Sequence, residues 1–461
     1  MDFSDRFIRF FKSFLPAPFT IAVVLSTLTF FLALFLTKPA ESGWWDYSVV
    51  LMNFWEGGLW TNSLLVFAVQ MMLMLVLGHV LALTKPASNL INRLSSYCTT
   101  TSKAAFLVSL LTITVALFNW GLGLIFGAIF ARKVGEYARQ NGHKINYPLV
   151  GACGYVGLMV WHGGLSGSSL IKVAESGHLN ELVQLSGSTM LNIVPDRIGF
   201  DQTVFSSMNI TASLLVLILV PSIMYLVGKR FQNHSVELPT VGEVHLPEIE
   251  ITGAERLDHS KILAFFFAAV ILGATFIKAF VQAPSLLNFF TPNNINFLLL
   301  GLGLLLHGNF YRFLKAIEQA IGGVSGILIQ FPLYFGIMGI MNNSGMVQDF
   351  SQFFVSISSE FSFPIFTFIS AGIVNIFVPS GGGQWVVQGP IILQAADALG
   401  VALPKSILAL AYGDQLTNML QPFWALPLLG ITGLKAKDIL PFTLILFLIG
   451  GILYLSVLML F

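Results

Sequence analysis

The sequence predicts an all-α integral membrane protein with two inverted repeats, about nine transmembrane helices, two re-entrant hairpins and several broken helices. Three observations carry this prediction. Charged residues make up 10% of the 461 residues, whereas an ordinary soluble domain has roughly 25%. The mean hydropathy is +0.80, and apolar runs of about 20 residues, the length that crosses a bilayer core, recur along the chain. Two longer apolar stretches are interrupted by glycine-rich runs, which a simple span does not need.

The apolar runs that we expect to cross the membrane are separated by short loops and one longer polar linker. They cover residues 18–37, 63–83, 147–165, 207–227, 261–280, 295–311, 319–341, 405–430 and 439–461. A basic, phenylalanine-rich stretch at 1–17 is expected to form an amphipathic lead-in on the membrane surface. The chain is therefore divided into a first repeat at 18–227, a cytoplasmic linker at 228–260, a linking span at 261–280 and a second, inverted repeat at 295–461.

The two interrupted stretches are predicted to enter and leave the membrane on the same side. The first, 104–131, is broken at Asn119–Gly123 and has Lys and Arg on both flanks. The second, 363–396, is broken at Pro379–Gly383 and lies in a region without Lys or Arg. Because Lys and Arg favour cytoplasmic loops, the first hairpin is expected to open inward and the second outward. The same rule places the N-terminus in the cytoplasm and the C-terminus outside.

Weak echoes between the halves support a repeat. Asn119 and Asn375 lie 256 residues apart, and the run Ala152–Tyr155 resembles Ala409–Tyr412. His162 and Asn418 have the same spacing of 256 residues. Inverted repeats with broken helices are the usual build of secondary transporters, whose substrate lies near the midplane where the repeats meet.

The hairpin tips are the predicted substrate site, because glycine lets a ligand approach the backbone and half-helix N-termini favour a carboxylate. Asn119, Asn375, Ser380 and Gln384 are expected to help hold the carboxylate, and Trp120 and Trp385 to line a short alkyl tail. The candidate substrate residues are Asn119, Trp120, Gly121, His162, Gly163, Asn375, Pro379, Ser380, Gly381, Gly382, Gly383, Gln384 and Trp385. The alternatives are a plain tight turn at each tip and, for His162, a polar residue satisfied at a helix end.

An acidic residue within an apolar span marks an ion or proton pathway by default. Asp414 is such a residue, and Thr417, Asn418 and Gln421 follow it as oxygen-bearing neighbours. These four residues are the candidate coupling site. Either a sodium ion held by oxygen atoms or a proton on Asp414 would suit them, and a purely structural hydrogen bond is the alternative.

Other function classes lack their signatures. The sequence has no nucleophile elbow, no phosphate-binding loop and no histidine pair at metal spacing, so we expect neither an enzyme nor a metal site. The net charge of +1 does not suggest a nucleic-acid partner. No cofactor is expected beyond a coupling proton or sodium ion.

Three motifs resemble the bacterial short-chain fatty acid transporter family, which is linked to acetoacetate and butyrate uptake. They are Asn119–Gly123, the run Val378–Pro390 and the run Gln421–Pro427. The resemblance implies membership of the wider ion-transporter superfamily, a symporter in the bacterial inner membrane, an elevator-type movement and a homodimer. It favours a small monocarboxylate as the substrate. A dicarboxylate or other organic anion, a channel, and a membrane scaffold or sensor remain the alternatives.

Overall fold

The computed structural model describes residues 16–185, 194–232, 253–282, 289 and 291–461, and these ranges contain helices and no strands. Residues 1–15 of the expected lead-in and 233–252 of the expected linker lie outside them. In the described part of the chain, seven helices are long and apolar enough to cross a membrane. The prediction of an all-α, multi-pass membrane protein is therefore confirmed.

Six of the nine expected spans coincide with these long helices. They are α2 (Pro18–Leu36), α4 (Asn62–Ala82), α11 (Ser207–Arg230), α13 (Lys261–Ile277, continued by a π-helical turn, η3, to Gln282), α17 (Ser325–Asn343, preceded by α16, Phe310–Ala320, and η4, Ile321–Val324) and α23 (Ala436–Leu460). A seventh expected span is the shorter α15 (Pro292–His307). The helix α3 (Trp44–Leu59) was not expected, because Asp46, Asn53 and Glu56 lower the hydropathy of this stretch.

Both interrupted stretches form pairs of helices separated by a short break. The first pair is α6 (Thr101–Phe118) and α7 (Trp120–Gln140), which pack against each other. The second is α19 (Phe363–Phe377) and α20 (Gly381–Ala398). The break in the first pair is Asn119, whose backbone is extended at φ −150° and whose side chain caps α7 by accepting from the N–H of Leu122. In the second pair Ser380 is also extended and caps α20 by accepting from the N–H of Gly383.

The remaining two expected spans are broken helices. The first consists of α8 (Tyr147–Tyr155) and a 3₁₀ turn, η1 (Val156–Met159), and then loses regular structure. The second consists of α21 (Leu403–Thr417), a 3₁₀ turn, η5 (Asn418–Leu420), and α22 (Pro422–Thr432). Pro422 lacks an N–H and therefore suits the first turn of a new helix better than the interior of a continuous one. Each half of the chain thus contributes one hairpin and one broken helix.

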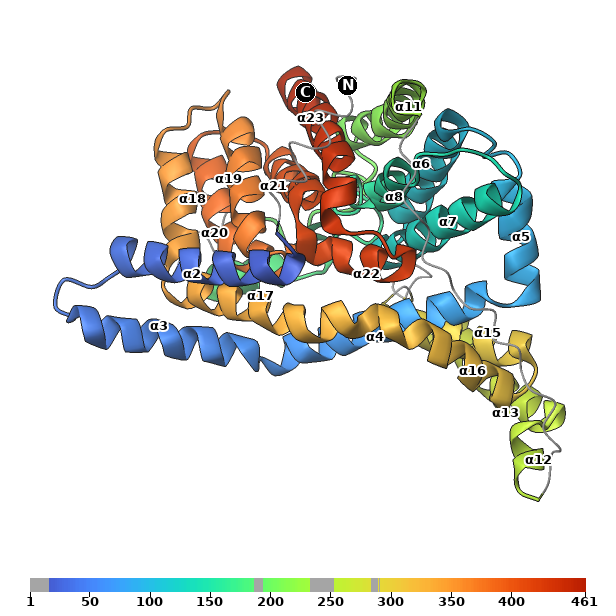
Figure 1. The fold of residues 1–461 in the computed structure, drawn as a ribbon. Helices are drawn as coiled ribbons and strands as arrows, with labels where there is room; N and C mark the ends of the chain where they lie inside the picture. The colour runs from blue at the N-terminus through green and yellow to red at the C-terminus, as the bar shows by residue number, and fades with distance from the viewer. Residues whose placement is uncertain (1–15, 186–193, 233–252, 283–288, 290) are drawn as a thin grey trace.

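Two antiparallel rods form one side of the molecule (Figure 1). α3 leads into α4, and α16 leads into α17; α3 packs against α17 while α4 packs against α16, so the two rods run in opposite directions. α2 covers α17 and α3, whereas α13 and α15 stack beside α4. Close backbone approach requires small residues where the rods meet, and Gly58 of α3 lies against Gly336 and Gly339 of α17.

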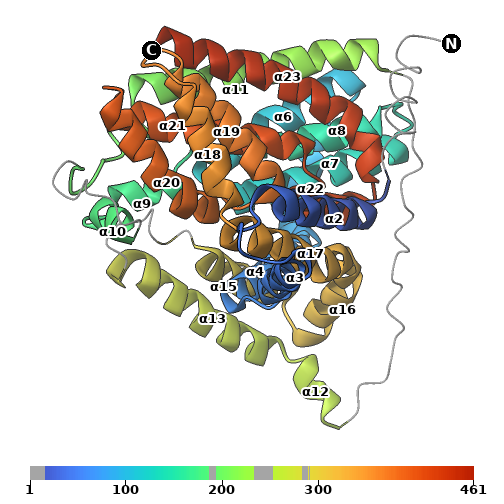
Figure 2. The same ribbon diagram turned by 90° about the vertical axis from the view of Figure 1, so that its left-hand side faces the viewer.

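The hairpins and broken helices lie together on the other side of the rods (Figures 1 and 2). α11 packs against α6 and against α23, which in turn contacts α8, α21 and η5. The second hairpin is covered by three shorter helices, which are α9 (Ser168–Ala174), α10 (His178–Leu185) and α18 (Met346–Ser356). The remaining short helices are α5 (Lys85–Ser95) and α12 (Glu255–Asp258). This arrangement brings both hairpin tips and both breaks into one buried region.

Candidate functional site

A buried chain of three side chains joins the two halves at the breaks. His162 lies in the irregular segment after η1, Asp414 lies in α21, and Ser169 lies in the first turn of α9. The Nδ1 atom of His162 is 2.5 Å from Oδ2 of Asp414, and its Nε2 atom is 2.7 Å from Oγ of Ser169. All three residues are at most 1% exposed. Asp414 was predicted as a coupling residue and His162 as a substrate residue. In the structure their side chains are in direct contact.

The other predicted coupling residues form a network around Asn375 at the end of α19. Its Nδ2 atom donates to the backbone oxygen of Asp414, to Oγ1 of Thr417 and to Oδ1 of Asn418, at 2.7 to 2.9 Å. The side chain of Gln421 donates back to the backbone oxygen of Asn375. Asn375 was expected at the substrate, but in the structure it connects the second hairpin to the break in the second broken helix.

Two tyrosines that lie 257 residues apart in the sequence form hydrogen bonds that link each half of the chain to the break in the other half. The hydroxyl of Tyr155 in α8 donates to the backbone oxygens of Asn418 and Gln421 at 2.8 and 3.2 Å. The hydroxyl of Tyr412 in α21 donates to Asn209 of α11, which itself donates to the backbone oxygen of Gly163. These are the tyrosines of the echoing Ala152–Tyr155 and Ala409–Tyr412 runs, so equivalent positions perform reciprocal roles.

The tip of the first hairpin meets a cluster of aromatic rings. Trp120 lies 5.8 Å from Trp161 and 5.2 Å from Trp424, measured between ring centroids. Phe67 of α4 contacts both Trp120 and Trp424. The N–H of Trp120 donates to Oγ of Ser166, which fixes the tip to the first broken segment. Trp120 therefore packs among aromatic rings from other segments, whereas Gly121 faces Met74 of α4.

The tip of the second hairpin lies against His162. A Cβ atom placed on Gly381 would be 2.7 Å from the Trp161 ring and 2.8 Å from Cε1 of His162, so only glycine fits here. Gly382 faces Ser168 at the start of α9. Pro379 is buried, and Ser380 and Gly383 form the cap of α20. The first-turn N–H groups of α20, which no helical carbonyl can accept, begin beside the imidazole.

Two predicted substrate residues are occupied elsewhere. Nε2 of Gln384 donates to the backbone oxygen of Ala371 and to Oε1 of Gln388, both within the second hairpin. Nε1 of Trp385 donates to Nε2 of His178 in α10 at 3.1 Å. Burial lowers the pKa of His178, with a further contribution from Lys172, and a neutral imidazole is what this contact requires. Trp385 therefore connects α20 to α10, while the aromatic neighbours of Trp120 come from other elements.

Several residues of the site were not singled out from the sequence. Oε1 of Gln415 accepts from the N–H groups of both His162 and Gly163 at 3.0 Å and so ties the first break to α21. Ser169, Trp161 and Trp424 complete the contacts described above. The detectable signal was their position: Ser169 and Trp161 flank His162, and Gln415 and Trp424 fall in the polar and proline-rich runs after Tyr412.

The polar network leaves several buried oxygens without a hydrogen bond in the described part of the chain. They are Oδ1 of Asp414, Oδ1 of Asn375, Oε1 of Gln384 and Oε1 of Gln421. A buried carboxylate oxygen without a donor is costly, so Asp414 is the group here with the strongest need for a proton or a cation. No group of three His, Cys, Asp or Glu side chains gathers within the described residues.

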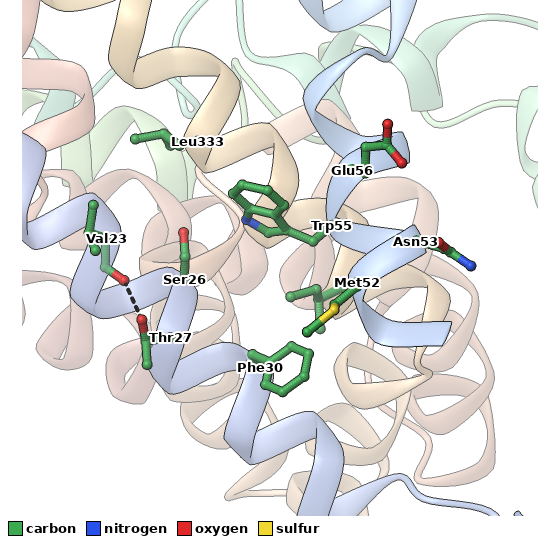
Figure 3. A pocket seen from close by; sticks show the side chains of 10 residues that line it. Val23, Ser26, Thr27, Phe30, Met52, Asn53, Trp55, Glu56 and Leu333 are labelled. Atoms are coloured by element: carbon green, nitrogen blue, oxygen red, sulfur yellow. Dashed lines mark hydrogen bonds between the residues drawn. The ribbon is translucent and has the colours of Figure 1, made fainter. Parts of the chain in front are cut away.

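A hollow of about 660 Å³ lies away from this network, between α2, α3 and α17 (Figure 3). Phe30, Met52 and Leu333 give it an apolar lining, and Asn53 and Glu56 lie on α3 at its side. It touches neither hairpin tip nor either break. Glu56 at its side would repel a carboxylate.

Comparison with known proteins places the whole chain in one group. Residues 1–461 match a family model described as Short chain fatty acid transporter. A protein of Escherichia coli strain K12 is 35% identical over 464 residues and is matched over 99% of both chains. A protein of Haemophilus influenzae strain Rd is 36% identical over 447 residues, covering 95% of both chains. Both are named "Putative short-chain fatty acid transporter".

Two solved structures also resemble this chain at low sequence identity. The YdaH transporter of Alcanivorax borkumensis has a TM-score of 0.41 and 15% identity, with 95% of this chain and 97% of that chain covered. MtrF of Neisseria gonorrhoeae, described with a class of antimetabolite efflux pumps, has a TM-score of 0.43 and 13% identity, with 99% and 97% covered.

Proposed function

Because the chain belongs to the short-chain fatty acid transporter family, we propose that it is a secondary active symporter of short-chain monocarboxylates such as butyrate or acetoacetate. The observation that carries the coupling is Asp414. It is a buried acid whose Oδ1 has no partner in the described residues, and it bonds directly to the histidine beside the second hairpin tip. An ionisable side chain buried in an apolar span marks an ion or proton pathway by default.

The substrate is proposed to lie between the two tips. Its carboxylate would accept from the first-turn N–H groups of α20 near Gly381, where the helix dipole also favours an anion. Its alkyl tail would lie against the rings of Trp120, Trp161 and Trp424. Because neither tip supplies an arginine for bidentate binding, a small monocarboxylate suits the site better than a dicarboxylate.

The movement is proposed to be of the elevator type. The rods α3–α4 and α16–α17, with α2, α13 and α15, would form the fixed part in the bacterial inner membrane. The two hairpins and two broken helices would move together, since Tyr155, Gln415 and Tyr412 link the breaks across the halves. A homodimer built on the fixed part, and an N-terminus in the cytoplasm, complete the proposal.

The direct test is uptake of radiolabelled butyrate into proteoliposomes that contain the purified protein. Because protonated short-chain acids cross lipid unaided, protein-free vesicles under the same gradients give the baseline. We expect a saturable component above this baseline that an imposed cation gradient accelerates. A panel of unlabelled competitors separates monocarboxylates from dicarboxylates. A flux that rises linearly with butyrate would indicate a channel, and no saturable flux under any gradient would contradict the proposed substrate.

The aromatic cluster predicts chain-length selectivity. Replacing Trp120 with alanine removes the ring that contacts Trp161 and Trp424. Loss of contact with two methylene groups, at about 0.8 kcal/mol each, would raise the KM for butyrate about tenfold. Longer acids such as hexanoate should be affected less, since they can occupy the vacated space. Trp60→Ala, at a 61% exposed position on α3's end, is the control; equal changes in both variants would remove Trp120 from the site.

A further inference from the structure

The hydrogen bonds around His162 fix the position of its proton. The backbone N–H of Ser169 donates to Nε2 of His162 at 3.1 Å. A backbone N–H can only donate, so Nε2 must be the unprotonated nitrogen. The imidazole proton is therefore on Nδ1, from which it is donated to Oδ2 of Asp414 at 2.5 Å. In this arrangement the histidine is neutral and accepts at Nε2.

Beside a neutral histidine, an ionised Asp414 would give the buried pair a full negative charge. Oδ1 of that carboxylate has no partner within the described residues. An isolated charge in a low-dielectric interior is expensive, whereas a hydrogen-bonded ion pair is much less so. A second proton on the imidazole would convert the pair into imidazolium and carboxylate with zero net charge. The lone pair of Nε2 is where that proton would bind.

Several of the oxygens that a sodium ion would need are already used as acceptors, although Oδ1 of Asp414 and Oε1 of Gln421 have no donor within the described residues. Oγ1 of Thr417 and Oδ1 of Asn418 each accept from Asn375 at 2.9 Å. The backbone oxygens of Asn418 and Gln421 accept from Tyr155. A sodium ion, which needs several oxygen ligands at once, would have to displace these donors. A proton at Nε2 of His162 displaces only the two donors of Ser169, its backbone N–H and its hydroxyl.

The second hairpin tip explains how a proton on His162 would affect substrate binding. The Gly381 position, at the N-terminus of α20, lies against Cε1 and Nδ1 of the imidazole. An anion bound there would face the negative pair in its unloaded form and be repelled. After protonation it would face an imidazolium instead. Besides Asp414, the groups that face His162 are Gln415 from α21, Ser169 from α9 and the stacked ring of Trp161. Gln415, Ser169 and Trp161 have uncharged side chains, so Asp414 is the acid of this set.

We propose that the coupling ion is a proton bound at Nε2 of His162, that Ser169 is the positioning residue for this proton, and that one proton crosses with each monocarboxylate. This rests on the proposed function. The proton comes from water on the side of entry and forms the Nε2–H bond. The Ser169 hydroxyl then turns from donor to acceptor, while its backbone N–H loses its partner. On the other side the Nε2–H bond breaks and the proton returns to water, so the cycle moves no net charge.

The test compares saturable butyrate uptake under three separate gradients. We expect a pH gradient to accelerate uptake into proteoliposomes, and a sodium gradient or a potassium–valinomycin potential to leave it unchanged. Butyrate binding to the purified protein, followed by calorimetry, should weaken as pH rises, because fewer molecules then carry the proton on Nε2 of His162.

Ser169→Ala supplies a readout that a merely structural role would not move. A hydroxyl that accepts from imidazolium gives a charge-assisted bond, which is stronger than the bond it donates to the neutral ring. Its removal therefore disfavours the protonated form, and the pH at which binding is half-maximal should shift downward. Ser169→Thr, which keeps the hydroxyl, should restore the wild-type profile. Ser406→Ala is the matched control, because Ser406 is also fully buried but its hydroxyl donates to the backbone oxygen of Ala402, the residue before α21.

The outcomes separate the two proposals. Saturable uptake driven by sodium at constant pH, or by membrane potential alone, would overturn proton coupling at His162 and leave the transport function standing. An unshifted pH profile in Ser169→Ala would overturn the role of Ser169. Absence of saturable butyrate binding and uptake in the wild type would contradict the proposed function itself.

Discussion

Asp414→Asn is expected to abolish the acceleration of butyrate uptake by a pH gradient and to preserve exchange of internal for external butyrate. The asparagine keeps the size of the side chain and can still accept from Nδ1 of His162, which lies 2.5 Å from Oδ2. It carries no negative charge, so it cannot stabilise an imidazolium at His162. The initial rate of uptake under a pH gradient should fall to that of protein-free vesicles, whereas counterflow, which needs no coupling ion to be released, should continue.

The control is a second buried acid with a different role. Asp438 is 7% exposed and caps α23 by accepting from the N–H of Lys435. Asp438→Asn removes the same charge and should cost at most about 1 kcal/mol of stability, as for a cap that keeps a polar acceptor. Its uptake should still be accelerated by a pH gradient. If uptake by Asp414→Asn is also accelerated, Asp414 has no coupling role; if both variants lose the acceleration, the loss does not report on coupling at Asp414.

The sequence was sufficient to predict the fold class and the positions of the breaks because both depend on local chemistry. Length and hydropathy mark the long helices, and Asn119 and the Pro379–Gly383 run mark the points at which a helix cannot continue. α3 escaped this reasoning because its acids and Asn53 resemble a loop by composition. Its identity as a helix comes from packing against α17, which involves residues far away in the chain.

The sequence predicted several residues of the site, but it predicted only partly which of them contact one another. Asp414 stood out as an acid in an apolar span, and His162 as a histidine beside a glycine-rich break. That the two touch depends on contacts over 252 residues, which no local pattern encodes. The same holds for Trp120 and Trp424. Trp385 lies one turn beyond Gly381 on α20, and this shift of about 5.4 Å along the helix takes its ring to α10 and His178.

The contact between the second hairpin and the second broken helix predicts the largest effect on stability. α19 and α21 approach so closely that a Cβ on Gly413 would overlap the carbonyl oxygen of Phe368 and lie 2.9 Å from its carbonyl carbon. These are backbone atoms and cannot rotate away, so Gly413→Ala must push the helices apart. Overpacking of this kind costs about 1–3 kcal/mol, which exceeds the small gain in helix propensity of up to about 1 kcal/mol from replacing glycine.

Gly413→Ala should therefore lower the melting temperature in detergent and should also reduce butyrate uptake, because it displaces the neighbouring Asp414 from His162. Gly57→Ala is the matched control. Gly57 also lies within a helix, α3, and a Cβ there would meet no atom within 4 Å, so the same substitution should be neutral or slightly stabilising. A Gly413→Ala protein as stable as Gly57→Ala would mean that α19 and α21 are not in backbone contact. That result would also contradict the hydrogen bonds from Asn375 to Asp414, Thr417 and Asn418, because these bonds cross the same interface.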